Sequence, residues 1–247
     1  MFKKYVFIFA ATTLLTLAGV MNGIAASGNG GGGDGFCKGK GAGERNCIYD
    51  GIPDRSEAYT LTQEEEAHLL FMREEEKLAR DVYDAFYLSY GRLIFDNISD
   101  AEQNHMDALK NLLDRNSLDD PILGVGLFAD PELQARYDEL MLFASDPTKA
   151  LIAGARIEEM DFVDIQHAIE NTEPEEVVST YESLLCGSGN HLRAFIRQLE
   201  AISVEYEPLG EASGGLEPDE FWAIAHSDME RGCGNRDDDK GYGKGRT

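Results

Sequence analysis

Four long segments of this chain repeat apolar residues with the period of an α-helix, and we find no β-strand alternation between them. We expect long helices at about residues 62–90, 95–115, 147–170 and 174–202, and shorter ones at 130–143 and 218–231. Four helices of this length can enclose one shared apolar core. The sequence therefore predicts an all-α fold, a four-helix bundle with short accessory helices.

The ends of these helices carry recognisable signals. Thr62 is a good N-cap residue with Glu65 three positions later, which predicts a capping box. Gly91 is expected to end this first helix, and Pro174 is expected in the first turn of the fourth long helix. Within that fourth helix, Gly187-Ser188-Gly189 favours a break or a kink, with Ser188 capping a second half.

The first 26 residues have the layout of a secretory signal peptide. Lys3 and Lys4 precede an apolar run over residues 6–20, and small residues follow at Ala25 and Ala26. The run is shorter than the ~20 apolar residues that a spanning helix needs. We therefore expect an exported protein, periplasmic or extracellular, that leaves the membrane once this segment is cleaved.

Composition divides the remaining chain into three parts. A glycine-rich lead over 27–60 precedes a helical domain over 61–231, and a tail rich in Gly, Asp, Lys and Arg covers 232–247. We expect both termini to be flexible. Export permits disulfides, and of the three possible pairings the local one, Cys37–Cys47 with Cys186–Cys233, is favoured.

The chain is strongly acidic, with 46 acidic and 22 basic residues and a formal net charge of −24. Nucleic acids and anionic membranes are bound by positive charge, so this balance argues against both as partners. A negative surface attracts cations such as metal ions. A merely solvated acidic surface would have the same composition.

Glu102 and His105 form a Glu-x-x-His pair on the second long helix. Residues three apart lie on one helix face, and this face continues through apolar positions that include Ile98 and Leu109. A carboxylate and an imidazole therefore point together toward the core, where an unpaired charge is costly. Helix bundles that hold two metal ions use this spacing. Surface pairs and satisfied core residues share it.

The other long helices also place polar groups on apolar faces. On the first helix, Glu75 and Glu76 each interrupt an apolar stripe, and periodicity does not choose between them. The other charges of residues 73–81 are expected on a solvated face with pairs four apart. On the third, Glu158 and Asp161 interrupt a single stripe; on the fourth, His191 lines up with apolar residues, as a core histidine would.

The combination gives two similar halves, Glu76 followed by Glu102-x-x-His105 and Glu158 followed by Ser188-x-x-His191. Four helices that each contribute inward polar groups are typical of a carboxylate-bridged di-iron or di-manganese site. Oxygen-rich ligands with a few imidazoles suit iron or manganese. The predicted ligands of one or two such ions are Glu76, Glu102, His105, Glu158, Asp161 and His191.

These motifs resemble a known superfamily. Glu76-x-x-Ala79-x-x-x-Tyr83 with Glu102-x-x-His105 is similar to the first half of ferritin-like proteins, rubrerythrin in particular. The runs at 75–83, 99–108, 157–161 and 190–195 more closely resemble the uncharacterised ferritin-like family known as domain of unknown function 2202. The resemblance covers about residues 62–202. It implies a ferritin-like bundle and a metal pair, and no established reaction.

Carried over residue by residue, the resemblance makes Glu102 the first bridging carboxylate and His105 a terminal ligand. Glu76 matches the first-helix ligand, Glu158 with Asp161 a carboxylate pair on the third helix, and His191 the second imidazole. Ser188 departs from the pattern, which has the second bridging carboxylate there. Either Asp161 fills this gap, or the second ion is weakly bound, or one ion binds.

Two functions follow as hypotheses. The first is an exported metal-binding protein with peroxidase- or ferroxidase-like activity, in which Tyr83 either hydrogen-bonds a ligand or is a plain core residue. Rubredoxin-type cysteine pairs are missing from the sequence, so its electron donor would be external. The alternative is a non-enzymatic acidic helical-bundle module with a degenerate site that binds metal ions or a partner. No phosphate-cradling loop or catalytic triad signature is present.

Overall fold

The computed structural model describes residues 59–228, and within this range the chain is all-helical, with no strand. The elements are α1 (Gln63–Tyr90), α2 (Leu93–Arg115), α3 (Pro131–Phe143), α4 (Pro147–Glu170), α5 (Glu175–Ala201), the 3-10 turn η1 (Glu211–Ser213) and α6 (Pro218–Ala225). The predicted all-α fold, a helical bundle with short accessory helices, is confirmed for these residues.

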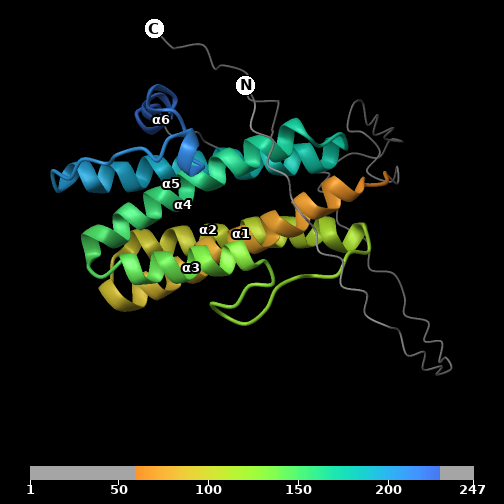
Figure 1. The fold of residues 1–247 in the computed structure, drawn as a ribbon, viewed down its shortest axis with the longest axis horizontal. Helices are drawn as coiled ribbons and strands as arrows, with labels where there is room; N and C mark the ends of the chain where they lie inside the picture. The colour runs from red at the N-terminus through yellow and green to blue at the C-terminus, as the bar shows by residue number, and fades with distance from the viewer. Residues whose placement is uncertain (1–58, 229–247) are drawn as a thin grey trace, which may run out of the picture. The chain divides into compact units, whose positions relative to one another are not determined.

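The four long helices form two pairs. α1 packs along α2, and α4 packs along α5, each pair being joined by a short connection; the α4–α5 pair then lies against the α1–α2 pair (Figure 1). α3 packs across α1 and α4, and α6 packs on α5. This arrangement brings side chains from α1, α2, α4 and α5 together in one interior.

The predicted caps of α1 are both present. The Thr62 side chain accepts the backbone N–H of Glu65, and the Thr62 backbone N–H donates to Glu65 Oε2 at 2.7 Å. Gly91 adopts a left-handed φ of 63° and donates its N–H to the Tyr87 carbonyl, which ends the helix. Pro174 differs by one position from the prediction: it is the N-cap, and α5 begins at Glu175.

The expected break at Gly187-Ser188-Gly189 is wrong, because α5 runs unbroken from Glu175 to Ala201. The physical reason lies on the neighbouring helices. A Cβ at position 187 would lie 2.5 Å from His105 Nε2, so Gly187 lets α5 approach the histidine closely. The last short helix, expected to reach 231, ends at Ala225.

Two apolar clusters fill the bundle. One contains Leu192 and four aromatic residues, Tyr83, Phe86, Phe95 and Phe195. The rings of these four pack on one another, with several centroid separations of 5.4–6.3 Å. The other contains Leu69, Met72, Leu109, Tyr181 and Leu184. Burying such side chains stabilises a fold by about 1.5–3 kcal/mol each relative to exposure. The two clusters hold the four helices in register at both ends of the interior.

A polar layer separates these two clusters. On α1, Glu76 lies between Met72 of the second cluster and Ala79 of the first. On the other three long helices, too, polar residues lie between residues of the two clusters: Glu102 and His105 on α2, Glu158 and Asp161 on α4, and Ser188 and His191 on α5. All six predicted ligands therefore belong to this layer.

The charged stretch 73–81 of α1 is buried, and the prediction of a solvated face is wrong. The linker over residues 116–130 covers it. Glu74 accepts the backbone N–H groups of Ala129 and Asp130 at 2.6 and 3.0 Å. Lys77, fully buried, donates to Asp81 at 2.6 Å and to the Leu127 carbonyl at 3.2 Å. These charges fasten the linker to α1 through hydrogen bonds that a solvated face would lack.

A second buried carboxylate fastens the segment that follows α5. Glu159 on α4 accepts hydrogen bonds from the Tyr206 hydroxyl at 2.8 Å and from the backbone N–H groups of Leu209 and Leu216 at 2.9 and 3.0 Å. A Cβ at Gly215 would collide with this carboxylate, so only glycine fits there. Glu159 thus holds residues 206–216 against the outside of the bundle.

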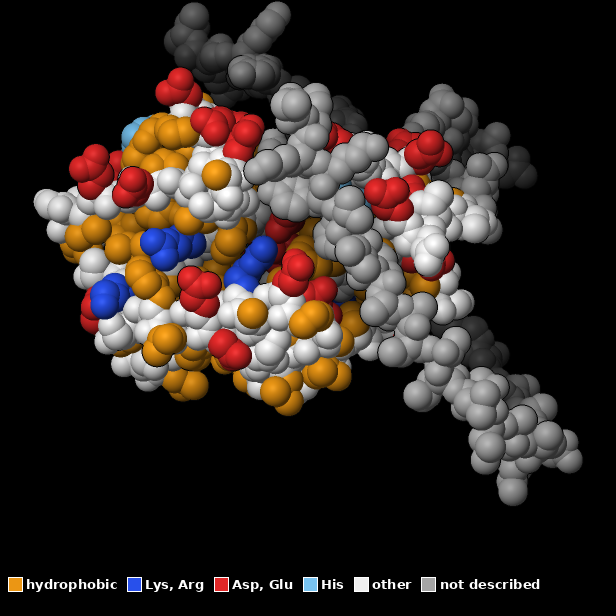
Figure 2. Space-filling model, viewed as in Figure 1, with side chains coloured by type: hydrophobic (Ala, Val, Ile, Leu, Met, Phe, Trp, Pro, Cys, Tyr) orange, Lys and Arg blue, Asp and Glu red, His pale blue; other side chains and the backbone are white. Residues whose placement is uncertain are grey.

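The surface of the described part reflects the acidic composition. Figure 2 shows acidic side chains over the face in view, with a few basic ones between them. Among the helices of residues 59–228, none has both the length and the apolar character to cross a bilayer.

Several predictions concern residues outside 59–228: the signal peptide, the glycine-rich lead, the tail and the cysteines Cys37, Cys47 and Cys233. They stay predictions. Cys186 on α5 is disulfide-bonded. Its predicted pairing with Cys233 involves a residue outside the described range and stays a prediction.

Candidate metal centre

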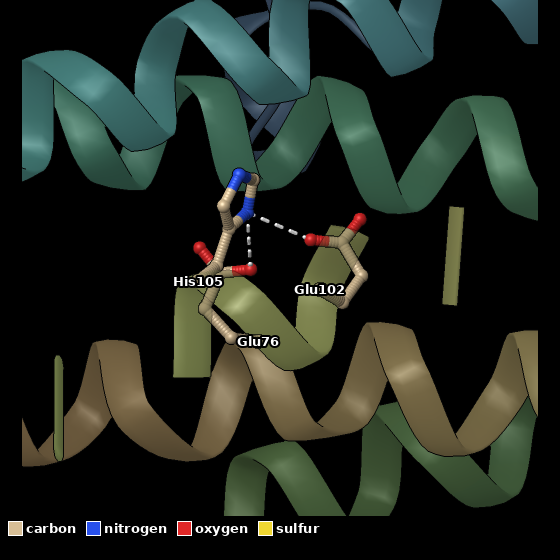
Figure 3. Close-up of side chains that lie close together, drawn as sticks. All are labelled: Glu76, Glu102 and His105. Atoms are coloured by element: carbon tan, nitrogen blue, oxygen red, sulfur yellow. Dashed lines mark hydrogen bonds and ion pairs between the residues drawn. The ribbon is translucent and has the colours of Figure 1, made fainter. Parts of the chain in front are cut away.

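The first ligand group joins α1 and α2. His105 Nδ1 lies 3.1 Å from Glu76 Oε2 and 2.8 Å from Glu102 Oε2 (Figure 3). Glu76 and Glu102 are each 1% exposed. The helical spacing of Glu102 and His105 explains their convergence, and the neighbouring helix α1 brings Glu76 to them.

The second ligand group shares Glu102 with the first. His191 Nδ1 on α5 lies 2.9 Å from Glu102 Oε1 and 3.4 Å from Glu158 Oε2 on α4. Glu102 therefore turns one carboxylate oxygen toward each histidine. The two imidazole rings are nearly parallel, with centroids 5.6 Å apart. Each group offers three ligand atoms that lie within 4.8 Å of one another.

Asp161 lies beside this centre and belongs to neither group of three. Its Oδ2 accepts the Ser188 hydroxyl at 2.5 Å, and its negative charge acts on that of Glu76. The structure thus brings a carboxylate to the position where Ser188 replaces the expected one. Glu76 Oε1 and Asp161 Oδ1 are both buried and have no hydrogen-bond partner among the described residues.

The carboxylates of this centre have pKa values that are shifted in different directions. Burial and the neighbouring Glu102 raise the pKa of Glu76 to about 8, against the opposing effect of His105. Burial and Glu102 likewise raise the pKa of Glu158 to about 7. For Glu102, burial acts in the same direction, but His191 and His105 outweigh it and hold its pKa below the ordinary value. Glu102 is the carboxylate that stays ionised.

The neighbouring carboxylates raise the pKa values of both histidines. Although burial favours the neutral ring, Glu102 and Glu158 raise the pKa of His191 to about 10. Glu76 and Glu102 raise the pKa of His105 well above its usual range. Protons therefore balance the buried negative charge, and a cation that binds here has to displace them.

The structure places Glu76, and not Glu75, beside His105. Glu75 turns away from His105 and accepts Arg136 Nη1 of α3 at 2.5 Å, while Glu76 enters the first ligand group. The two residues are neighbours in the chain and point about 100° apart around the helix. Arg136, on α3, supplies the contact that periodicity could not show.

Tyr83 was expected either to hydrogen-bond a ligand residue or to be a plain core residue, and the structure shows the hydrogen bond. Its hydroxyl donates to Glu158 Oε1 at 2.5 Å, and its ring packs against those of Phe95 and Phe195. Burial and the charge of Glu158 raise its pKa well above 10, so the hydroxyl stays protonated. Tyr83 therefore orients Glu158 and closes the aromatic side of the centre.

Sequence reasoning missed Gly187, which leaves room for the His105 ring. The sequence does show a glycine close to the predicted ligand on this helix. It stands one residue before Ser188, three before Asn190 and four before His191. Local sequence predicts a helix breaker at this glycine, because its partner His105 lies on α2, far away in sequence.

The donor set fits a pair of hard or borderline divalent ions. The two groups offer three carboxylates and two imidazoles, and Asp161 beside them offers a fourth carboxylate. Glu76 Oε1 and Asp161 Oδ1 have neither a hydrogen-bond nor an ion-pair partner among the described residues. A carboxylate shared between two such groups is the arrangement found in di-iron and di-manganese helical bundles.

Comparison with known proteins places the chain in a family. Residues 65–215 match the family described as an uncharacterized protein domain, DUF2202. The chain is 38% identical over 175 residues to the uncharacterized protein MJ0754 of Methanocaldococcus jannaschii, covering 70% of this chain and 92% of that protein. The crystal structure of the hypothetical protein MJ0754 from Methanococcus jannaschii superposes with a TM-score of 0.66 at 36% identity, covering 70% of this chain and 98% of that one. This chain therefore belongs to the DUF2202 family.

Proposed function

We propose that this protein is a ferritin-like metal-binding protein that holds two iron or manganese ions in the polar layer of its bundle. Glu76, Glu102 and His105 hold one ion, and Glu102, Glu158 and His191 hold the other. The observation that carries the proposal is the position of Glu102, with its two oxygens 2.8 and 2.9 Å from the two histidines.

Charge balance supports two ions. The polar layer contains four buried carboxylates, Glu76, Glu102, Glu158 and Asp161, and charges of one sign are costly there. Two divalent cations neutralise four ionised carboxylates, with both histidines neutral. Asp161 then completes the first ion's ligands through its partner-free Oδ1, with Ser188 fixing its other oxygen.

The ligand types support iron or manganese, which accept mixed carboxylate and imidazole ligands. When bound, such ions supply one-electron redox chemistry with oxygen or peroxide. The chain's own residues prepare the site for it. Tyr83 holds Glu158 by a hydrogen bond, and Phe95 and Phe195 exclude water on that side. We propose peroxidase- or ferroxidase-like activity with an external electron donor, in a protein exported from the cell.

One observation favours a second function. Ser188 stands where ferritin-like proteins of the expected pattern carry a carboxylate, and it is fully buried. A hydroxyl is a poor ligand for these ions. In this alternative the bundle is a non-enzymatic module with a degenerate site that binds a metal ion or a partner.

Metal content tests the proposal. Iron and manganese are measured per chain after purification without chelators, for the wild type and for His105→Ala. His226→Ala is the matched control, because His226 is an exposed histidine that pairs with Glu200 away from the centre. We expect about two ions per chain in the wild type and the control, and a loss in His105→Ala. Less than one ion in the wild type, after loading with either metal, contradicts the proposal.

A further inference from the structure

A second pair of histidines lies outside the central layer. The rings of His68 on α1 and His167 on α4 meet edge to face with centroids 5.4 Å apart. His68 is half-buried and His167 is exposed. His68 Nδ1 is itself buried and has no hydrogen-bond partner among the described residues. The pair therefore joins one exposed and one half-buried imidazole at the contact between α1 and α4.

Acidic groups surround this pair. Asp164 precedes His167 by one turn on α4, and Glu64 precedes His68 by one turn on α1. Burial and the neighbouring His167 lower the pKa of His68, while Glu64, Glu65 and Asp164 act in the opposite direction. Two imidazoles and a carboxylate are a ligand set for borderline divalent transition metals. The ligand atoms of His68, His167 and Asp164 do not all lie within 4.8 Å of one another in this structure, so a side chain has to rotate for the three to hold one ion.

The pair also lies at one end of a row of carboxylates. Asp164 interacts with Glu75, and Glu75 interacts with Glu76 of the central group. Asp161 interacts with both Glu75 and Glu76. Exposure falls along this row, from Asp164, whose side chain is 36% exposed, to Glu75 at 3% and Glu76 at 1%.

The distances along the helices suit the stepwise passage of an ion from the outer histidines to the central cluster. His68 and Glu76 are two turns apart on α1, about 12 Å along the axis. Glu75 and Asp164 lie between them, held by Arg136 at 2.5 and 3.7 Å. The Arg136 side chain is 28% exposed, so it has solvent into which it can swing when a cation replaces it.

We propose that His68, His167 and Asp164 form an outer site for a divalent transition-metal ion, and that ions pass from it along Glu75 and Asp161 to the central cluster. The exposed His167 side chain rotates to close the outer site around the ion. The first half does not depend on the central cluster. The second half rests on the proposed function of the central cluster.

Binding of Co²⁺ to the full chain tests the first half, because its absorption spectrum reports nitrogen ligands. In the His105→Ala/His191→Ala variant we expect one bound Co²⁺ per chain, and we expect its loss when His167→Ala is added. In the otherwise wild-type chain, His167→Ala lowers the bound Co²⁺ from three to two, which makes the test independent of how the double variant folds. Binding that His167→Ala leaves unchanged overturns the outer site.

These outcomes also separate the two proposals. If the central cluster fails, the wild type binds one Co²⁺, which is lost in His167→Ala and kept in His105→Ala. If the outer site fails, the wild type binds two, which are lost in His105→Ala/His191→Ala and kept in His167→Ala.

The rate of loading tests the second half. Stopped-flow absorption follows Co²⁺ reaching the central cluster, with His226→Ala as the exposed-histidine control. We expect His167→Ala to slow this phase by about tenfold, the lower end of what local charge and ligand focusing contribute to association rates. The final central occupancy stays the same. Equal loading rates in the wild type and His167→Ala overturn the passage from outer site to centre.

Discussion

Ser188 on α5 donates a hydrogen bond to Asp161 Oδ2 on α4 at 2.5 Å, while Asp161 Oδ1 remains buried and without a partner among the described residues. The contact joins the one position where the chain departs from the expected ligand pattern to a carboxylate three residues after Glu158. In our account Ser188 is a positioning residue. It fixes one oxygen of Asp161 and leaves the other for an ion.

Ser188→Ala therefore weakens the binding of one ion. Losing an outer hydrogen bond to a ligand costs about 10–100-fold in metal affinity. We expect this loss in a competition titration against a chromophoric chelator. Ser99→Ala is the control, because Ser99 bonds Asp84 outside the polar layer. Equal affinity in Ser188→Ala and the wild type would contradict the positioning role of Ser188.

Gly187→Ala displaces the His105 ring, since the added Cβ would lie 2.5 Å from its Nε2. We expect this variant to bind about one ion per chain fewer than the wild type. The same substitution stabilises the helix itself, because alanine is favoured over glycine by about 1 kcal/mol in a helix interior. Metal content and circular dichroism measure the two effects.

Gly189→Ala is the matched control for this substitution. Its Cβ would meet the Arg193 and Phe162 side chains at 3.4 Å, a distance to which side-chain ends adapt, and it does not meet His105. We expect the full metal content in this variant. A loss of metal in both variants would trace the effect to α5 in general and not to the His105 ring.

Metal binding strengthens as pH rises. Ions compete with the protons held by Glu158, Glu76 and His191, whose pKa values are about 7, 8 and 10 without a bound ion. Between pH 6 and 9 each proton released contributes up to about a tenfold gain in affinity per pH unit. Calorimetry in buffers of different ionisation enthalpy counts these protons. Affinity that does not change with pH would contradict the charge assignment.

Glu159→Gln destabilises the protein without removing metal. Its carboxylate accepts three hydrogen bonds that hold residues 206–216, and bonds to a charged group contribute about 1.5–3 kcal/mol each. The amide of glutamine keeps part of this stabilisation. We therefore expect the free energy of unfolding, measured in urea, to fall by about 2–4 kcal/mol. Glu170→Gln, at an exposed site on the same helix, is the control. Metal loss in Glu159→Gln would mean that the segment also supports the centre.

The helices could be predicted because their signals are local. The Thr62–Glu65 capping box, the Gly91 terminus and the apolar periodicity each involve residues within a few turns. The break expected at Gly187-Ser188-Gly189 failed because their partners, His105 and Asp161, are on other helices. A glycine that terminates a helix and one that permits close approach look alike in sequence.

The residues of the candidate site could be listed from the sequence, but their geometry could not be predicted. Helical spacing pairs Glu102 with His105, and the structure brings all six predicted ligands to one polar layer. Choosing Glu76 over Glu75 required Arg136 on α3. The burial of Lys77 and Glu74 depends on the linker at 116–130, which no periodicity on α1 reports.

The central claim is that Glu102 bridges two ions, and anomalous diffraction tests it most directly. Crystals of the full chain loaded with iron or manganese are measured above and below that metal's absorption edge. We predict two anomalous peaks, one on each side of Glu102 and about 3.5–4 Å apart, the separation typical of two-metal sites. No peak beside Glu102 after loading, or a single peak bound by one histidine alone, would contradict the account.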